Sequence, residues 1–508
     1  MWIVVFLGTQ VALSADPRFV PVQAPRPFTF HELERLAIDD PPSGALAGHL
    51  SQVLSEPTID NAATFAGTLP HQPVASGIKV LRVAEWNINR GVNFDGVLSS
   101  LSKDSRFVGE ASTHLSRSAQ KQLIQELHLL RSADVIVLDE VDDGMKRTGY
   151  RNVAQSLARE LHFNYAYGVE FIELNKIYLR LKHLDRPPGT RTLDRAKALA
   201  LDPDRYLGFE GTAILSRYPI VRARNTRLPD CYDWYHGEIK EVSDLEYLRR
   251  WSAETIFDEQ IRRQVRRGGR MALIADLAVP GATGDRVTIV APHLEDYCAP
   301  GCRTVQMDGL LRQIQNTPND VVVAGDLNTT GRDGTPVSLQ REILKRVTSW
   351  RFWGKEALFW FLPVPFAGLI DVPVNYFKNY HDPTAVSIPL ILPNRERQLF
   401  DSVRLFRFRD MGQFDFAGNP HLAAKHKGHT LSDTNQRSWK GFVPTFSFNK
   451  TYWHLVGSYK LDWFFAKCMH SQSELAGPRA GRVLREVNTA LGYRISDHAP
   501  STVDLPLN

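Results

Sequence analysis

The sequence has few cysteines, which limits what can hold the fold together. Four cysteines in 508 residues are too few for a disulfide-built scaffold. Cys298 and Cys302 stand close together in HLEDYCAPGCRT, but no second Cys or His pair follows at ligand spacing, which disfavours a zinc site. We expect a local Cys298–Cys302 disulfide if the compartment is oxidising, with Cys231 and Cys468 as core or surface thiols.

Long hydrophobic runs and strong net charge are also missing. No apolar stretch reaches the length of an uninterrupted membrane helix. The formal net charge is +5, and there is no long basic arm or aromatic-basic stripe. This mild excess suits an anionic substrate without indicating a nucleic-acid-binding tail. With 43% apolar and 23% charged residues and no internal repeat, the composition is that of a globular protein.

The first residues predict export. Trp2–Leu13 is apolar and is followed by the small residues Ser14 and Ala15, as in a secretory signal peptide over residues 1–15. The basic region that usually precedes such a segment is missing, so the true start could lie upstream. The alternatives are a buried N-terminal strand or a mis-assigned start. We therefore expect a secreted or periplasmic protein.

Composition divides the rest of the chain into an arm and one catalytic domain. Residues 16–77 contain nine prolines, which predicts an arm or linker with a short helix around His31–Ala37. Strand and helix patterns alternate over residues 78–505. The clearest strands are IKVLRVAEWNI, ADVIVLDEV, GTAILS, MALIADLAV, RVTIVAPHL, DVVVAGDLN, YKLDWFFAK and STVDLPL; the clearest helices are SAQKQLIQELHLL and NVAQSLARELHF.

Two insertions are predicted within this domain, at about 225–268 and 345–455. The first opens with a capping box at Ser243 and ends in a basic run, Arg262–Arg270, for which we favour a solvated helix end over an anion contact. The second contains the apolar segment 357–377, which prolines interrupt. We favour a packed loop for this segment and keep contact with a membrane surface as the alternative.

Polar side chains recur where predicted buried strands end. In VVVAGDLNTT, Asp326 and Asn328 are two residues apart, so their side chains face the same side at the end of a strand. A turn explains any one such pair, because Asp and Asn are turn residues. Six segments of this kind in one chain are harder to explain by chance. The others contain Asn87 and Asn89, Glu140, His293, Asp462, and Asp497 with His498.

These segments resemble the endonuclease/exonuclease/phosphatase superfamily, which includes deoxyribonucleases, abasic-site endonucleases, neutral sphingomyelinases and inositol-polyphosphate 5-phosphatases. WNIN, LDE, GTAILSRYPI, APHL, GDLN, LDWFF and SDHAP carry the resemblance, in the family's order and approximate spacing, from about Ile78 to Leu505. The resemblance implies an α/β (α+β) fold, a four-layer sandwich of two sheets with the site at one rim.

The resemblance also implies roles for individual residues. Glu140 would be the main metal ligand, with Asn87 and Asp497 completing the metal or water network. The expected ion is Mg²⁺ or Mn²⁺. In the abasic-site endonucleases the position of Asn89 is an acid, so the amide here weakens the case for a second metal.

The remaining site residues would act on water and phosphate. Asp326 and Asn328 would orient the nucleophilic water and bind the phosphate, and Asp462 would hold His498. His293 matches the second histidine of the deoxyribonuclease and sphingomyelinase branches. A His–carboxylate pair can take a proton from water near neutral pH, and a divalent ion offsets the charge that builds on a phosphate.

We therefore expect a metal-dependent phosphoester hydrolase. A phosphodiester substrate is favoured, either nucleic acid or a phospholipid such as sphingomyelin, and a small phosphate monoester is the alternative. A non-catalytic binding protein with the same sandwich is the rival from another class. No obligate protein partner is expected. Arg270 is equally consistent with a structural ion pair and a phosphate contact, and His421, His426 and His429 are expected in a solvated loop.

Overall fold

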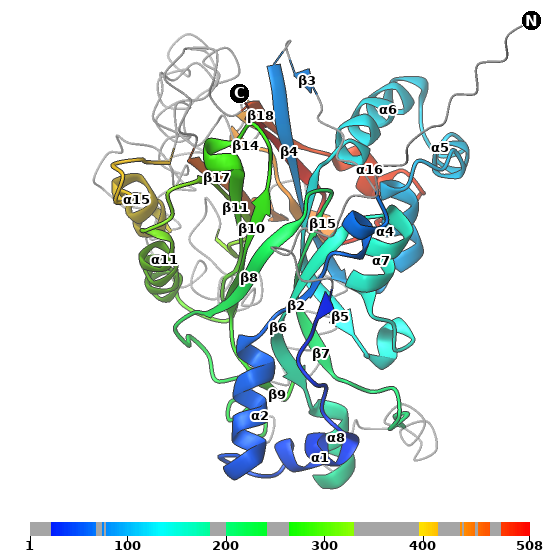
Figure 1. The fold of residues 1–508 in the computed structure, drawn as a ribbon. Coiled ribbons are helices and arrows are strands. Elements are labelled where there is room, and N and C mark those ends of the chain that lie inside the picture. Colours follow the sequence, from blue (N-terminus) through cyan, green and yellow to red (C-terminus); the bar gives the residue numbers. More distant parts are fainter. Residues whose placement is uncertain are drawn as a thin grey trace, which may run out of the picture.

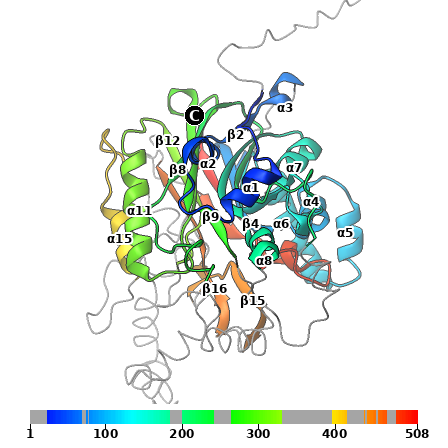
Figure 2. The ribbon, with the colours of Figure 1, turned by 90° about the horizontal axis from the view of Figure 1, so that it is seen from below.

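Two β-sheets packed face to face form the centre of the molecule. The computed structural model describes residues 22–67, 74–75, 78–182, 200–240, 264–329, 396–414, 437–438, 441–452, 456–467 and 479–507. Helices cover the outer face of each sheet (Figure 1). Seen from below, α11 (Pro300–Ile314) lies on one side of the sheets and α6 (Arg117–Arg131) on the other (Figure 2). The predicted four-layer, two-sheet sandwich is confirmed.

The first sheet has ten strands in the order β1-β2-β6-β7-β5-β4-β19-β18, with β3 paired to β4 and β9 paired to β6. The central pair, β4 and β5, is parallel and the other pairs are antiparallel. Its strands are β1 (Val22–Gln23), β2 (Thr58–Asp60), β3 (Val74–Ala75), β4 (Ile78–Arg90), β5 (Val135–Asp143), β6 (Asn164–Glu173), β7 (Phe209–Ser216), β9 (Arg266–Gly268), β18 (Arg479–Val483) and β19 (Ser501–Pro506).

The second sheet has five strands in the order β17-β12-β11-β10-β8. Here β11 and β12 form the parallel pair. Its strands are β8 (Ile220–Arg227), β10 (Met271–Ala278), β11 (Arg286–His293), β12 (Asp320–Asp326) and β17 (Asp462–Lys467). Two short hairpins accompany it, β13 (Arg437–Ser438) with β14 (Gly441–Phe442) and β15 (Phe446–Tyr452) with β16 (Val456–Tyr459).

The main core lies between the two sheets. Val83 and Val135 project from the first sheet, and Ile289 and Val322 project from the second into the same cluster. Strands β6, β7 and β12 are buried along their whole length. Burial on both faces is why the middle of β12, Val321–Ala324, is a continuous apolar run instead of an alternating pattern.

The outer helices pack through the faces that their sequences predict. In α6, Ser116 caps the helix by accepting from the backbone N–H of Ala119, and Leu123, Leu127 and Leu130 are buried. The other described helices are α1 (Phe30–Leu36), α2 (Gly44–Ser55), α3 (Ala62–Phe65), α4 (Phe94–Leu101), α5 (Arg106–Ala111), α7 (Val153–Leu161), α8 (Asn175–Lys182), α15 (Arg397–Leu405) and α16 (Arg485–Thr489), with 3₁₀ turns at Lys146–Thr148 and Thr283–Asp285.

Part of the predicted 345–455 insertion belongs to an outer layer. Leu399 and Phe400 of α15 are buried in the cluster that also contains Leu311 of α11. Segment 357–377 and the histidines at 421, 426 and 429 lie outside the described residues, so membrane contact through 357–377 stays a prediction. Among the described helices, none is long and apolar enough to cross a membrane.

The proline-rich segment is not an arm where it is described. The expected short helix is α1, which Thr29 and Glu32 begin with a capping box. However, β2 pairs with β6, and Leu33 and Leu36 are fully buried. The expectation of a linker was wrong for residues 22–67 because the prolines lie between elements, where they end one and precede the next. The limits at residues 15 and 505 stay predictions.

The basic end of the first predicted insertion is also different. Arg266–Gly268 forms β9, and the guanidiniums of Arg266 and Arg267 are buried instead of solvated. Arg266 lies 3.7 Å from the ring centroids of both Phe171 and Trp234. A solvated helix end was therefore the wrong expectation, because aromatic faces and carboxylates replace water around these cations.

An exposed histidine joins the N-terminal segment to the body of the protein. His236 Nδ1 lies 2.6 Å from Asp233, and its Nε2 lies 2.5 Å from Asp40, which also pairs with Arg267 at 3.0 Å. Hydrogen bonds to Asp233 and then Asp40 raise the pKa of His236 above its usual 6.5. Because the pKa of His236 is higher in the folded protein than in the unfolded chain, its ion pairs stabilise the fold fully at pH values below the unfolded pKa. This stabilisation is lost as the pH rises through the pKa of the folded protein.

We therefore predict that His236→Gln lowers the melting temperature more at about pH 5.5 than at about pH 8.5. Thermal unfolding of both proteins at the two pH values measures the difference. His31→Gln is the control, because His31 is exposed on α1 and its carboxylate contact is 3.9 Å long. An effect of His236→Gln that is equal at both pH values contradicts the prediction.

Candidate active site

Strand ends from both sheets bring the predicted residues together. Asn87 ends the regular part of β4, and Glu140 lies next to it in β5. Asp326 ends β12 in the other sheet and is paired directly with Asp462, the first residue of β17. His498 precedes β19. Because the two sheets face each other, side chains from these ends meet at one rim.

The backbone is distorted where it presents several of these side chains. Glu140, Asn89, Arg90 and Asn328 have positive φ angles of 50°, 46°, 65° and 48°. The pairing of β4 with β5 shifts register between Asn87 and Arg90. A positive φ angle is unfavourable for residues other than glycine. A β-bulge changes the direction in which side chains point at the edge of a sheet.

Asn87 links the acids of the two sheets. Its Nδ2 donates to Glu140 Oε1 at 3.2 Å and to Asp326 Oδ2 at 3.2 Å. Its Oδ1 accepts from the backbone N–H of Asn89 at 3.0 Å. Burial, together with the nearby charge of Asp462, raises the pKa of Asp326. The amide donor therefore holds together two carboxylates that would otherwise repel each other.

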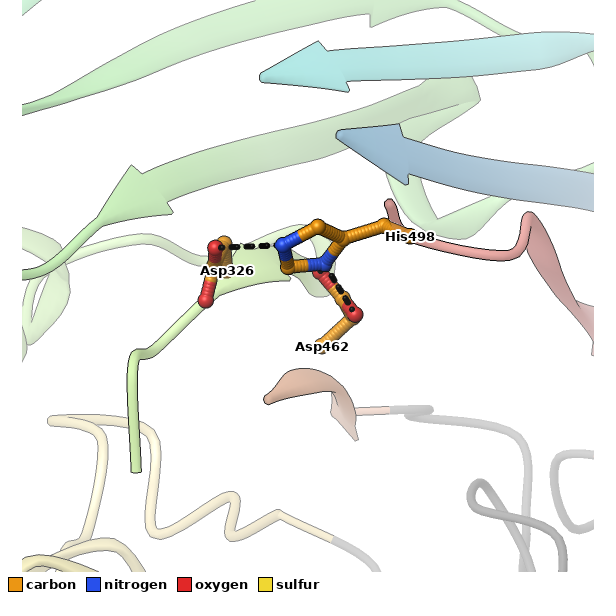
Figure 3. A group of neighbouring side chains, drawn as sticks. All are labelled: Asp326, Asp462 and His498. Atoms are coloured by element: carbon orange, nitrogen blue, oxygen red, sulfur yellow. Dashed lines mark hydrogen bonds and ion pairs between the residues drawn. The ribbon is translucent and has the colours of Figure 1, made fainter. Parts of the chain in front are cut away.

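His498 forms a hydrogen-bonded pair with Asp462. The Nδ1 atom of His498 lies 2.9 and 3.0 Å from the two oxygens of Asp462, and its Nε2 faces Asp326 Oδ2 at 3.7 Å (Figure 3). Burial alone would lower the pKa of His498, but the carboxylates of Asp462 and Asp326 raise it well above its usual value. The Asp462 pair fixes Nδ1–H as the donor and turns Nε2 towards the rim.

His293 forms a second pair with a carboxylate, Glu170 of β6. Its Nδ1 lies 3.0 Å from Glu170 Oε2, and its Nε2 lies 4.0 Å from Asp326 Oδ2. Burial and Arg270 would lower the pKa of His293, but Glu170 raises it to about 9. The Nε2 atoms of both histidines therefore face the same oxygen of Asp326, Oδ2.

Arg270 is a structural ion pair in this fold. Its guanidinium donates to Glu170 at 2.7 Å and to Asp296 at 2.7 Å, and the residue is buried. Of the two alternatives that the sequence left open, the structure therefore favours the ion pair. The contact with Glu170 also links Arg270 to the position of His293.

Two predicted residues, Asn328 and Asp497, contact the rest of the site less directly than the others do. The backbone N–H of Asn328 donates to Asp326 Oδ1 at 2.8 Å, but its side-chain Nδ2 donates to the carbonyl of Leu294 at 3.0 Å. Asp497 is half-buried and accepts from the hydroxyl of Ser496 at 3.1 Å. Burial raises the pKa of Asp497, the neighbouring charge of Glu140 acts in the same direction, and His498 opposes both.

The donor set around Glu140 fits a hard divalent cation. Glu140 and Asp497 offer carboxylate oxygens. Asn87 would offer its amide oxygen only after a side-chain flip that gives up its bonds to Glu140, Asp326 and the backbone N–H of Asn89. The Glu140 side chain is 23% exposed, which leaves room for water and substrate. Mg²⁺ and Mn²⁺ prefer oxygen ligands, and Mg²⁺ usually keeps several waters, so one or two carboxylates suffice.

A second group, Asp326, Asp462 and His498, also has ligand atoms within 4.8 Å of one another. We consider it less suited to a metal, because the Asp462 side chain has no exposure and both its oxygens contact His498 Nδ1. A cation there would have to displace that pair. The arrangement is better suited to holding a proton-accepting imidazole beside Asp326.

The disulfide prediction was wrong. Cys302 bonds to Cys231, 71 residues earlier, with a Cα–Cα distance of 5.9 Å, and Cys298 is a free thiol. Cys298 Sγ instead contacts the carbonyl of Glu295 at 3.4 Å, while Cys302 lies in the first turn of α11. The partner of Cys302 comes from the loop after β8, which only the tertiary fold brings alongside.

We predict that mass-spectrometric mapping of oxidised protein finds the Cys231–Cys302 linkage. Replacing both cysteines with serine should destabilise the fold by about 2–4 kcal/mol, because the crosslink restricts the unfolded chain. Cys298→Ser should change stability much less. A mapped Cys298–Cys302 peptide, or equal melting temperatures for all three proteins, contradicts the assignment.

Several residues of the site escaped sequence reasoning. Glu170 supports His293, and Asp139 accepts the backbone N–H of Asp326 at 2.8 Å. The Ser496 hydroxyl donates to the carbonyl of Asn87 at 2.8 Å. Glu170 and Asp139 could have been found by the argument that applies to Asp462, since each is a carboxylate inside an apolar strand, where an unpaired charge is costly.

The chain matches a known protein family over most of its length. Residues 84–498 match the model of the Endonuclease/Exonuclease/phosphatase family, which is more than half of the chain. No curated protein is significantly similar in sequence.

Solved structures that match include an endonuclease/exonuclease/phosphatase from Beutenbergia cavernae DSM 12333, with 16% identity, coverage of 84% of this chain and 72% of that one, and a TM-score of 0.35. The catalytic domain of human Nocturnin with bound sulfate has 14% identity, coverage of 84% and 95%, and a TM-score of 0.37. The 3'-5' exonuclease of Neisseria meningitidis has 12% identity, coverage of 84% and 99%, and a TM-score of 0.37. By the family match, this chain belongs to the endonuclease/exonuclease/phosphatase family.

Proposed function

We propose that this protein is a divalent-metal-dependent phosphodiesterase in which the Asp462–His498 pair activates water. One observation carries the proposal: His498 is held at Nδ1 by both oxygens of Asp462, while its Nε2 lies 3.7 Å from Asp326. In its neutral form, an imidazole oriented in this way accepts a proton at Nε2, and the carboxylate stabilises the imidazolium that forms. Asp326 is placed to orient the attacking water.

The metal site supports the same chemistry. Glu140, Asn87 and Asp497 would hold Mg²⁺ or Mn²⁺, and the bound ion would offset negative charge on the phosphoryl oxygens. Asn87 lies between this site and the water-activating residues, since its side chain contacts both Glu140 and Asp326 at 3.2 Å. The two parts of the site therefore act on one phosphate.

A diester is favoured over a monoester because two imidazoles face Asp326 Oδ2. His293 Nε2 lies 4.0 Å from Asp326 Oδ2, on a ring that Glu170 anchors through Nδ1. A second imidazole beside the phosphate can donate a hydrogen bond to a phosphate oxygen as charge builds there. Nucleic acid and phospholipid both remain substrates consistent with this site, as does a small ester.

Turnover of bis-p-nitrophenyl phosphate with Mg²⁺, Mn²⁺ or EDTA tests the proposal. We expect release of p-nitrophenolate with either metal and none with EDTA. Faster turnover of p-nitrophenyl phosphate than of the diester would favour the phosphomonoesterase. Absence of metal-dependent turnover on both, and on a panel of plasmid DNA, RNA, sphingomyelin and inositol phosphates, would favour a non-catalytic binding protein.

We also propose that the protein is secreted or periplasmic. The apolar stretch Trp2–Leu13 supports export, and the Cys231–Cys302 disulfide suits an oxidising compartment. Cell fractionation of the native host, with N-terminal sequencing of the recovered protein, tests this. Recovery from the cytosol with residues 1–15 intact and Cys231 reduced contradicts it.

A further inference from the structure

Arg90 has hydrogen-bonding capacity that the fold does not use. Its Nε donates to Glu210 Oε2 at 3.1 Å and lies 3.9 Å from Glu140 Oε2. Among the described residues, no partner accepts from its Nη1 or Nη2. The side chain is 25% exposed, so these donors can reach solvent or a ligand.

A neighbouring arginine shows what a purely structural guanidinium does here. Arg147 shares Glu210 with Arg90 and is exposed to a similar extent, at 24%. However, its Nε and Nη2 both bond to Asp142, and its Nη1 pairs with Glu173. Every nitrogen of Arg147 therefore has a carboxylate partner, whereas the Nη1 and Nη2 atoms of Arg90 have none within the described part of the chain.

The backbone holds Arg90 at a conformational cost. Asn89, Arg90 and Gly91 have successive φ angles of 46°, 65° and 70°. Asparagine and glycine tolerate this left-handed region, but an arginine adopts it at an energetic cost. Strain of this kind persists where the surrounding structure dictates it and is common in ligand-binding sites.

The position of Arg90 relative to Glu140 defines what it could bind. Glu140 Oε1 accepts from Asn87, on the side of Asp326, whereas Oε2 faces Arg90. The catalytic pair and Asp326 therefore lie on one flank of Glu140, and Arg90 lies on the other. A phosphoester bound between Glu140 and Asp326 leaves Arg90 beside the next group of the substrate.

We propose that Arg90 binds a second anionic group of the substrate, a phosphate or carboxylate adjoining the scissile phosphoester. A guanidinium fork with two free Nη groups matches the paired oxygens of such an anion. The subsite deepens the proposed function, on which it rests, by selecting esters that have a neighbouring negative charge. Nucleotides with two phosphates and phosphorylated polyols share this chemistry.

Two ligands that differ by one phosphate test the subsite by binding. Titration calorimetry in Mg²⁺ would compare thymidine 3′,5′-bisphosphate with thymidine 5′-monophosphate. A hydrogen bond to a charged group typically contributes enough for about a tenfold preference, which we expect for the bisphosphate. In Arg90→Gln the two affinities should agree within about twofold, and Arg90→Lys should retain part of the preference because it keeps the charge without the fork.

Arg151→Gln is the matched control, since Arg151 is an exposed arginine that lies over the Phe94 ring at 3.9 Å. It should keep the wild-type preference. Equal affinity of the wild-type protein for both ligands, or an equal loss for both in Arg90→Gln, overturns the subsite; the second result would mean that Arg90 only positions Glu140.

Turnover of bis-p-nitrophenyl phosphate on the same samples separates the two proposals. A preference for the bisphosphate that depends on Arg90, without turnover of any ester, refutes the hydrolase and supports the anion subsite. Metal-dependent turnover without that preference refutes the subsite and supports the hydrolase.

Discussion

Replacing Glu140 with glutamine should reduce kcat by at least about 10³-fold with a phosphodiester substrate. Glutamine has nearly the same shape but no charge, so it cannot offset a divalent cation as a carboxylate does. Glu140 is the carboxylate that faces both Asn87 and Arg90, and it is partly open to solvent. The measurement is steady-state turnover of bis-p-nitrophenyl phosphate over a range of Mg²⁺ concentrations.

The fold of the Glu140→Gln protein should persist. The side chain is only partly buried, and its cationic neighbour Arg90, 3.9 Å away, keeps its hydrogen bond to Glu210, so removing the charge of Glu140 does not leave a buried partner without compensation. Circular dichroism and thermal melting check this. Glu110→Gln is the control, because Glu110 is an exposed carboxylate on α5. Full Mg²⁺-dependent turnover in folded Glu140→Gln protein would show that the metal site is misplaced.

His498 and Asp462 should behave as one unit in a double-mutant cycle. We expect His498→Ala to reduce kcat by about 10²–10⁴-fold, the usual range for a positioned general base. Asp462→Asn should cost a comparable amount, because it removes the carboxylate that holds Nδ1 at 2.9–3.0 Å. Once either partner is lost, losing the other should matter little, so the double variant should be scarcely slower than the slower single variant.

The cycle is measured as kcat at saturating Mg²⁺ with the diester. The pair formed by His49 and Glu32, at 3.1 Å between α2 and α1, provides a matched control cycle. Its variants should leave kcat unchanged. Losses that multiply for His498 and Asp462 would show that the two residues act independently, and the proposed water-activating pair would then be wrong.

Much of the fold and of the site was predictable because the signals are local. Continuous apolar runs such as VVVAGD predicted buried strands, and the leucines of α6 predicted its packed face. The acids and amides at strand ends predicted a shared site, since residues two apart in a strand face one side. Asn87, Glu140 and Asp326 do meet, as do Asp462 and His498.

Other expectations failed where the deciding contact was remote. The partner of Cys302 is Cys231, and spacing alone favoured its near neighbour Cys298. The basic run ending at Arg270 looked solvated because its partners, Glu170 among them, are distant in sequence. Proline content made residues 22–67 resemble a linker, although β2 adds to the first sheet through β6.

The sequence by itself determined the family, the strands and the residues at their ends, because periodicity and short motifs depend only on neighbours along the chain. Only the tertiary structure decided which buried acidic side chain pairs with which buried basic side chain. It paired Glu170 with His293 across 123 positions and left the outer nitrogens of Arg90 without a partner among the described residues. Such pairing depends on distance in space, since a charge removed from water must find its partner within a few ångströms, wherever that partner lies in the chain.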